Sequence, residues 1–281
     1  MRLKNLLEGL VALSAVSLLG PAACSEPSEA PAGPGAQQVV VTADDWGWTT
    51  SGTGSLRTGW VSITFETLEG EADHSLQLIR FKNRGTIERS LEADDEAFLE
   101  MAEPLGGFVG VTGAETLTMT VRLDAGSYGM IDFGGTHEGG PNFLRGMTAS
   151  FEVGVGGGTA GIQPDSDGEI VLREFAIDLP DDFTGRGTYL VRNGGALLHE
   201  LDIGRLPAGA DAGEEVRRQA ETGQGSIAEL PGLATLSPGA QAYFELDLSS
   251  RSYVFVCFIE LPPDEEPHAL KGMFTPPITL G

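Results

Sequence analysis

Short runs of alternating apolar and polar residues recur along the chain and predict β-strands. Residues 117–123 (LTMTVRL) and 242–248 (AYFELDL) show this alternation clearly. A period of two with one apolar face is typical of the strands of an antiparallel sandwich. Similar or β-branched runs predict further strands at 39–43, 60–66, 75–81, 128–133 and 148–153, and at 169–177, 188–193, 199–206, 253–259 and 274–280.

Two copies of one unit make up most of the chain. His74 in DHSLQLIRF matches His199 in LHELDIGRL at an offset of 125 residues. The same offset, or 126, pairs Arg80 with Arg205, Tyr128 with Tyr253, Phe133 with Phe258, Pro141 with Pro267, Gly146 with Gly272 and Met147 with Met273. A helical segment also recurs, at 87–101 and 211–221. We therefore expect an all-β protein of two tandem Greek-key β-sandwiches, each with a short helical insert.

Changes in composition mark the ends of these units. A Gly-rich stretch, GVGGGTAGIQPDSDG at 154–168, has no apolar periodicity and separates the halves. We place a first domain at 36–155, a linker at 156–168 and a second domain at 169–281. The chain has 40 glycines in 281 residues without a collagen-like period, which agrees with a protein rich in turns.

Residues 1–24 have the pattern of an export signal. Arg2 and Lys4 precede an apolar run at 10–19 that is too short to span a bilayer, and small residues lead to Cys24. The segment resembles a bacterial lipoprotein signal, with Pro21 where lipoproteins usually carry an aliphatic residue, and the resemblance implies a lipid on Cys24. An ordinary cleaved signal is the alternative. Both interpretations predict an exported protein, either a membrane-anchored lipoprotein of the cell envelope or a periplasmic or extracellular one.

The segment after Cys24 has the composition of a linker. Residues 25–35 are rich in Pro, Ala, Gly and Ser, which suits a flexible tether.

The overall charge limits the kinds of partner that the chain can bind. The chain has 17 Lys and Arg residues and 41 Asp and Glu residues, so its formal net charge is −24. Nucleic-acid binding needs a basic footprint, so we expect no nucleic acid as a partner. The charge favours a self-repelling surface or a cationic partner.

Four residues of the second unit are candidate metal ligands. Cys257 lies in an apolar run, His268 follows eleven residues later, Met273 follows five residues after that, and His199 begins an earlier strand. Two His, one Cys and one Met form the ligand set of a blue-copper site, a trigonal plane with a weak axial Met. A soft thiolate stabilises Cu(I) and imidazole suits Cu(II). Zinc is the alternative metal, although its structural sites rarely use a thioether. Taken singly, each ligand also fits an ordinary core or strand residue.

The second unit resembles the cupredoxins, the blue copper proteins of the plastocyanin and azurin kind. Tyr-Val-Phe-Val-Cys at 253–257 matches the Tyr-x-Phe-x-Cys motif that precedes the family's copper loop. Gly272-Met273 matches the Gly-Met that closes this loop, and Asn-Gly-Gly at 193–195 resembles the turn before the family's first histidine. The fold expected for both units is therefore a cupredoxin-like sandwich.

This resemblance implies one type 1 copper ion, in the second domain. Two features depart from the family: ten residues separate Cys257 from His268, which is a long loop, and Glu200 replaces the Asn that often follows the first histidine. The ligands that the resemblance implies are His199, Cys257, His268 and Met273.

The first unit lacks two of these ligands. Asp132 stands at the position of the cysteine and Asn142 at that of the second histidine, while His74 and Met147 keep the ligand types. A blue-copper site needs a thiolate, so we expect a cupredoxin-like domain without copper that serves in packing or docking. The alternative is a hard-metal or type-2-like site built from His74, Asp132 and His137.

The chain's 4 histidines limit the number of metal centres that it can build. Multicopper oxidases and copper nitrite reductases need extra histidines for a second copper centre, and a blue site uses two of those present. The sequence also lacks the Gly-x-Ser-x-Gly, His-Glu-x-x-His and phosphate-binding Gly-Lys-Ser/Thr motifs. We therefore do not expect an enzyme.

The sequence thus predicts an exported, membrane-tethered type 1 copper protein that acts in one-electron transfer. Two alternatives stay open: a copper-binding or copper-delivery protein of the cell envelope, and a non-redox envelope interaction module. In cupredoxins the histidine corresponding to His268 lies near the surface and is the usual electron port. The acidic residues beside it predict either a docking rim for a basic redox partner or a solvated loop; they are Glu260, Asp264, Glu265 and Glu266.

Overall fold

The computed structural model describes residues 35–70, 72–136, 140–156, 161–261 and 265–281. The predicted signal at 1–24 with Cys24, and all of the tether except Gly35, lie outside the described residues. So do His137 and Asp264. Within the described ranges, every helix is too short or too polar to cross a membrane.

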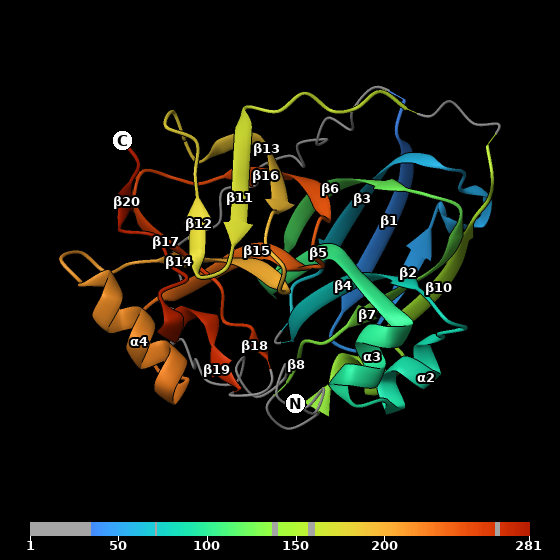
Figure 1. Cartoon of the computed structure of the whole chain (residues 1–281), viewed down its shortest axis with the longest axis horizontal. Helices are drawn as coiled ribbons and strands as arrows, with labels where there is room; N and C mark the ends of the chain where they lie inside the picture. The colour runs from blue at the N-terminus through green and yellow to red at the C-terminus, as the bar shows by residue number, and fades with distance from the viewer. Residues whose placement is uncertain (1–34, 71, 137–139, 157–160, 262–264) are drawn as a thin grey trace.

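Strands are the main secondary structure of the described chain (Figure 1). The first half contains β1 (Gln37–Asp44), β2 (Gly47–Ser51), β3 (Gly59–Thr67), β4 (Asp73–Phe81), β5 (Ala102–Thr112), β6 (Glu115–Leu123), β7 (Gly126–Asp132), β8 (Gly135–Thr136), β9 (Gly140–Pro141) and β10 (Thr148–Val153). The second half contains β11 (Gly168–Arg173), β12 (Ala176–Asp178), β13 (Arg186–Asn193), β14 (His199–Arg205), β15 (Ala228–Leu236), β16 (Gln241–Asp247), β17 (Ser252–Val256), β18 (Glu260–Leu261), β19 (Glu266–Pro267) and β20 (Ile278–Thr279). The helices are η1 (Thr53–Ser55), α2 (Ile87–Glu92), α3 (Asp95–Met101), η2 (Asn142–Arg145), α4 (Ala212–Thr222) and η3 (His268–Lys271).

Two eight-stranded sheets pack against each other. One has the order β12-β11-β13-β16-β6-β3-β1-β2, and the other has the order β10-β7-β4-β5-β15-β14-β17-β20. Their inner faces meet in one hydrophobic core that includes residues of both halves. At its centre Phe65 on β3 stacks on Phe108 on β5, with the ring centroids 5.7 Å apart. The all-β sandwich predicted from the alternating pattern is confirmed.

The alternating pattern predicted antiparallel sheets, and this prediction is wrong for one strand pair in each half. β1 pairs with β3 in parallel, and β11 pairs with β13 in parallel, while the other neighbouring strands are antiparallel. Alternation of apolar and polar residues indicates which face of a strand is buried, but it does not indicate the direction of the neighbouring strand. The parallel pairs repeat at the same place in each half.

The two halves are joined strand to strand in both sheets. β6 pairs with β16, and β5 pairs with β15. In these pairs Met119 faces Phe244 and Phe108 faces Leu233, and each residue is the counterpart of its partner at the offset of 125. Each joining strand therefore pairs with its own repeat, which places a local twofold axis between the halves.

The sequence pattern did not predict β5 or β15. Both contain glycine and proline, which usually interrupt strands. A Cβ atom on Gly107 would overlap the carbonyl oxygen of Leu76, and one on Gly232 would overlap that of Leu201. These two glycines are counterparts in the repeat, and they allow β5 to approach β4 and β15 to approach β14. Here glycine permits close strand pairing instead of marking a turn.

Each half carries a helical insert, as predicted. The segment expected as one helix at 87–101 is two short helices, because Asp94 accepts a hydrogen bond from the backbone of Ala97 (2.9 Å) and starts α3 anew. In the second half α4 occupies the predicted segment and is capped by Asp211. α2 and α3 lie at one end of the molecule and α4 at the other (Figure 1).

Candidate metal centre

His199, Cys257 and His268 come together in the second half. One possible ligand atom of each lies within 4.8 Å of the other two. All three side chains are buried, with 0, 0 and 1 % exposed. Met273 is buried as well, and its backbone is hydrogen bonded to two of the others: Cys257 N donates to Met273 O (3.1 Å), and Met273 N donates to His268 O (3.0 Å). The four residues predicted as ligands therefore form one buried cluster.

Neighbouring elements position these side chains. His199 begins β14, which pairs with β17, and Cys257 directly follows β17. His268 begins η3, and Gly272 ends it with a φ of 98°, a left-handed conformation that glycine adopts without strain. This turn sends the chain back to the sheet, so that Met273 lies beside the cysteine.

The imidazole of His199 lacks hydrogen-bond partners. Among the described residues neither of its ring nitrogens has one, although the side chain is 0 % exposed. The Glu174 carboxylate lies 3.8 Å from Nε2, which is too long for a hydrogen bond. Burial lowers the pKa of His199, so the neutral form that binds metals is favoured. A buried polar atom without a partner is costly, and a metal bound to one nitrogen would remove that cost for this nitrogen.

The thiol of Cys257 is held in a dry environment. Its Sγ lies 3.6 Å from Nδ1 of His268. Burial raises the pKa of the Cys257 thiol well above its usual range and the Glu200 carboxylate raises it further, while backbone hydrogen bonds from Glu200 and Ile259 oppose this rise. The free thiol is therefore protonated at neutral pH. A coordinated metal deprotonates a thiol outright.

This donor set fits a soft transition metal. A thiolate, two imidazoles and a thioether together are the ligands of type 1 copper, whereas hard cations prefer oxygen. The donors are already gathered by backbone hydrogen bonds, and the unpartnered imidazole of His199 leaves room in the hydrogen-bond network for a metal. The buried cluster therefore resembles a type 1 copper site.

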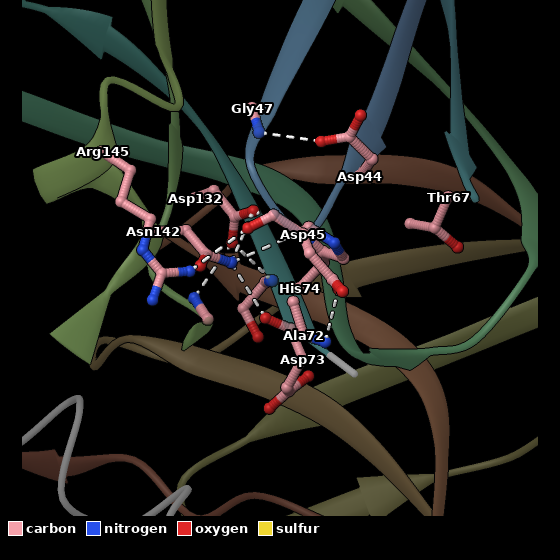
Figure 2. A network of polar contacts seen from close by, with 12 residues as sticks. Asp44, Asp45, Gly47, Thr67, Ala72, Asp73, His74, Asp132, Asn142 and Arg145 are labelled. Atoms are coloured by element: carbon pink, nitrogen blue, oxygen red, sulfur yellow. Dashed lines mark hydrogen bonds and ion pairs between the residues drawn. The ribbon is translucent and has the colours of Figure 1, made fainter. Parts of the chain in front are cut away.

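The first half fills the equivalent position with a polar network (Figure 2). Nδ1 of His74 lies 2.7 Å from Oδ2 of Asp132. Nδ2 of Asn142 donates to the same oxygen (3.1 Å) and to the backbone oxygen of Asp73 (3.0 Å). His137, the third member of the alternative hard-metal site, lies outside the described residues. Within the described ranges, the only grouping with metal-binding spacing is the one in the second half.

Sheet order and site together define the class of protein. A two-sheet sandwich with a buried His, Cys, His and Met cluster at one end of a repeat is a cupredoxin-like fold with a type 1 copper-like site. The fold predicted from the sequence, two tandem cupredoxin-like sandwiches with short helical inserts, is confirmed.

Comparisons with known proteins find copper proteins among solved structures. No protein-family model matches the chain, and no curated protein matches it. Auracyanin from Roseiflexus castenholzii is 22% identical with a TM-score of 0.27, over 41% of this chain and 95% of its own. A multicopper oxidase is 13% identical with a TM-score of 0.24, over 87% of this chain and 88% of its own. Copper nitrite reductase from Nitrosomonas europaea is 14% identical with a TM-score of 0.22, over 87% and 93%. Because these TM-scores are low, the assignment rests on the topology and the site.

Two residues beside the site were not predicted from the sequence. Glu174 and Phe175 form the turn between β11 and β12, and they lie against His199 and His268 respectively. The repeat contains a signal for this turn, because the matching turn of the first half also pairs an acid with an aromatic residue, Asp45 and Trp46.

His268 is covered in this structure. Its side chain is 1 % exposed, although the corresponding histidine of cupredoxins was expected near the surface. The ring of Phe175 lies edge-on to it, with centroids 5.5 Å apart and planes at 80°. Of the predicted acidic rim, Glu265 and Glu266 are exposed and Glu260 is partly buried.

Proposed function

We propose that this chain is a type 1 copper protein that transfers single electrons in the cell envelope. The observation that carries the proposal is His199, a fully buried imidazole with two unpartnered nitrogens beside Cys257 and His268. When bound, copper would supply one-electron redox chemistry by changing between Cu(I) and Cu(II). The residues that would hold it are His199, Cys257, His268 and Met273.

The chain's own part in this function is to fix its ligands and to exclude water. Three backbone hydrogen bonds close the ligand loop, because His268 N also donates to Ile259 O (3.0 Å). A loop closed in this way holds the donors in one arrangement for both oxidation states, which reduces the rearrangement that accompanies electron transfer. Burial of the donors favours electron exchange over ligand exchange at the metal.

The proposal includes the location and the partner. Export follows from the pattern at 1–24, and a lipid on Cys24 with the tether at 25–35 would hold the domains near a membrane surface. The net charge of −24 favours a basic redox protein as partner. The absence of catalytic motifs in the sequence supports an electron carrier over an enzyme.

A copper titration of the purified full chain tests this proposal. We expect one intense visible charge-transfer band with Cu(II), which ascorbate bleaches and ferricyanide restores. Cys257→Ser should abolish the band while the far-ultraviolet circular dichroism spectrum stays unchanged. Met273→Leu should shift the band and the reduction potential, whereas Met147→Leu, its counterpart in the first half, should change neither. Tight colourless Cu(I) binding without redox cycling would favour copper delivery, and failure to bind copper would favour an interaction module.

A further inference from the structure

The two halves carry equivalent two-residue turns next to the site position. Glu174 and Phe175 connect β11 to β12, and Asp45 and Trp46 connect β1 to β2. The acid of each turn accepts a backbone hydrogen bond from the segment before the first histidine. In the second half Leu197 N donates to Glu174 Oε1 (3.0 Å). Each turn is thus hydrogen bonded to the segment that leads into the strand with the histidine.

The first half makes the same bond, since Ala72 N donates to Asp45 Oδ1 (2.8 Å) and stands at the repeat offset of 125 from Leu197. The aromatic residues, however, differ in how they pack. Trp46 is 83% exposed, whereas Phe175 is only 36% exposed and lies edge-on to the ring of His268. The aromatic side chain of the turn packs inward in the second half, which has His268, and stays in solvent in the first half, which has Asn142 at the equivalent position.

The backbone of Phe175 is strained, and that of Trp46 is not. Phe175 has a φ of 61°, and the other described residues with a side chain and a positive φ are Asn83, Arg84 and Glu265. A bulky residue in the left-handed region is an outlier that persists where surrounding structure enforces it, and such residues cluster at functional sites. The strained conformation accompanies the inward packing of the ring.

The ring of Phe175 packs edge-on against His268 and is itself partly exposed to solvent. The histidine is 1% exposed, so its imidazole is covered by the side chains packed around it, and Phe175 is one of them. Lys271 Nζ lies 5.5 Å from the centroid of the same ring, which places a cation against it. The neighbouring Glu174 lies 3.8 Å from Nε2 of His199, so this one turn lies against both histidines of the cluster.

We propose that Phe175 is the cover of the metal centre: its ring closes His268 off from solvent and is the outermost group through which electrons reach the site. The role of Phe175 in electron contact rests on the proposed function, whereas its role in shielding His268 from solvent does not. Phe175 is a shielding residue, because its ring contacts a histidine of the cluster and supplies no metal-ligand atom.

The shielding is tested in the metal-free full chain by deuterium exchange at the imidazole C2 of His268, read by mass spectrometry of the peptide that contains it. Phe175→Ala should speed this exchange severalfold, and Phe175→Tyr should restore the slow rate. Trp46→Ala, the matched change in the first half, should leave it unchanged. Phe175→Gly suits the left-handed backbone and serves as a second variant if the alanine variant is poorly folded. An exchange rate in the alanine and glycine variants equal to that of the unaltered chain would overturn the proposal.

The electron contact is tested in the copper-loaded chain with tris(phenanthroline)cobalt(III) as oxidant. One electron leaves the reduced centre and converts cobalt(III) to cobalt(II). Removal of the ring brings the reagent closer to His268, so Phe175→Ala should speed this oxidation severalfold at matched driving force, and Trp46→Ala should not. Faster deuterium exchange with an unchanged oxidation rate would overturn the electron-contact part. A chain that fails to bind copper overturns the proposed function, while the exchange experiment still decides the shielding.

Discussion

Oδ2 of Asp132 lies 2.7 Å from Nδ1 of His74, and its other oxygen, Oδ1, accepts hydrogen bonds from the backbone of Ser75 (2.8 Å) and Gly134 (3.0 Å). The counterparts of these two donors, at the offset of 125, are Glu200 and Ile259, whose backbone groups bond to Cys257 in the second half. The same pair of backbone donors therefore holds a carboxylate in one half and a sulfur atom in the other. The first half therefore keeps the backbone arrangement of the second half's site, while Asp132 and Asn142 replace two of its four predicted ligands.

This relationship predicts one copper ion per chain. The hydrogen-bonded carboxylate of Asp132 and the amide of Asn142 occupy two ligand positions, so the first half should stay colourless with Cu(II). The double variant Asp132→Cys with Asn142→His should add a second thiolate band and raise the copper stoichiometry from one to two. Each single variant is the control and should stay at one. Two blue coppers in the unaltered chain would show that the alignment of the halves is wrong.

The sequence predicted which residues gather in the second half, because the repeat shows Cys257 and His268 against the altered counterparts Asp132 and Asn142. The sequence predicted less of the strands and turns that surround these residues. β5 and β15 were missed because Gly107 and Gly232 resemble turn residues, whereas their role is to let two strands approach closely, which only the folded structure shows. The cover by Phe175 was missed for a similar reason, since a two-residue turn carries no periodic signal and its ring meets a histidine some ninety residues away.

A buried acid in the first half should make stability depend on pH. Burial, together with the charges of Glu229 and Asp132, raises the pKa of Asp73 from 3.8 to about 7, and its Oδ1 is buried without a hydrogen-bond partner among the described residues. The folded chain therefore keeps a proton that the unfolded chain releases near pH 4. The stability that this protonated group contributes is complete below about pH 4 and is lost as the pH rises to about 7.

Replacing this group should remove the dependence. Asp73→Asn should stabilise the chain at pH 8 by about 2 kcal/mol, a value reduced from the full shift because the residue is partly exposed, and should have little effect at pH 4. Urea unfolding at the two pH values measures the difference. Asp165→Asn, at an exposed acid, is the control and should change stability at neither pH. An equal effect of Asp73→Asn at both pH values would assign the gain to packing instead of titration.

The strand pairing between the halves should make them unfold together. Phe244 is 1% exposed, pairs with Met119 across the joint and lies 6.2 Å from the ring of Phe108. Phe244→Ala removes a buried ring from the joint and should lower the free energy of unfolding by about 3–5 kcal/mol. Val155→Ala, at an 81% exposed side chain, is the control and should change it by less than about 0.5 kcal/mol.

Two probes separate the halves in this experiment. All 3 tryptophans lie in the first half, but Trp60 packs on Tyr243 of the second half, with ring centroids 5.5 Å apart. In a Trp60→Phe background the fluorescence of Trp46 and Trp48 reports on the first half, while the copper band reports on the second half. The two transitions should coincide in urea, and Phe244→Ala should shift both by the same amount. Separate midpoints for fluorescence and absorbance would mean that the halves are independent domains despite their shared sheets.

The acidic rim beside the site should set the salt dependence of electron exchange with a basic partner. Glu265 and Glu266 are exposed and precede His268 by three and two residues, respectively. Rim charges act mainly on the association rate, and salt at physiological strength screens them over about 8–10 Å. With a basic cytochrome as the probe, the bimolecular rate should therefore fall as salt rises. Glu265→Gln with Glu266→Gln should slow exchange at low salt and flatten the salt dependence.

The control for the rim is a pair of acids placed elsewhere on the same half. Asp181 and Asp182 are exposed and precede β13, whereas the site lies beyond the other end of that strand, after Asn193. Their change to Asn removes the same net charge from the chain, so it reports the effect of overall charge alone. The reduction potential must be measured for both pairs, because loss of nearby negative charge disfavours Cu(II) and alters the driving force. If the two pairs slow exchange equally at matched driving force, the loop acts only through the net charge and is a solvated segment.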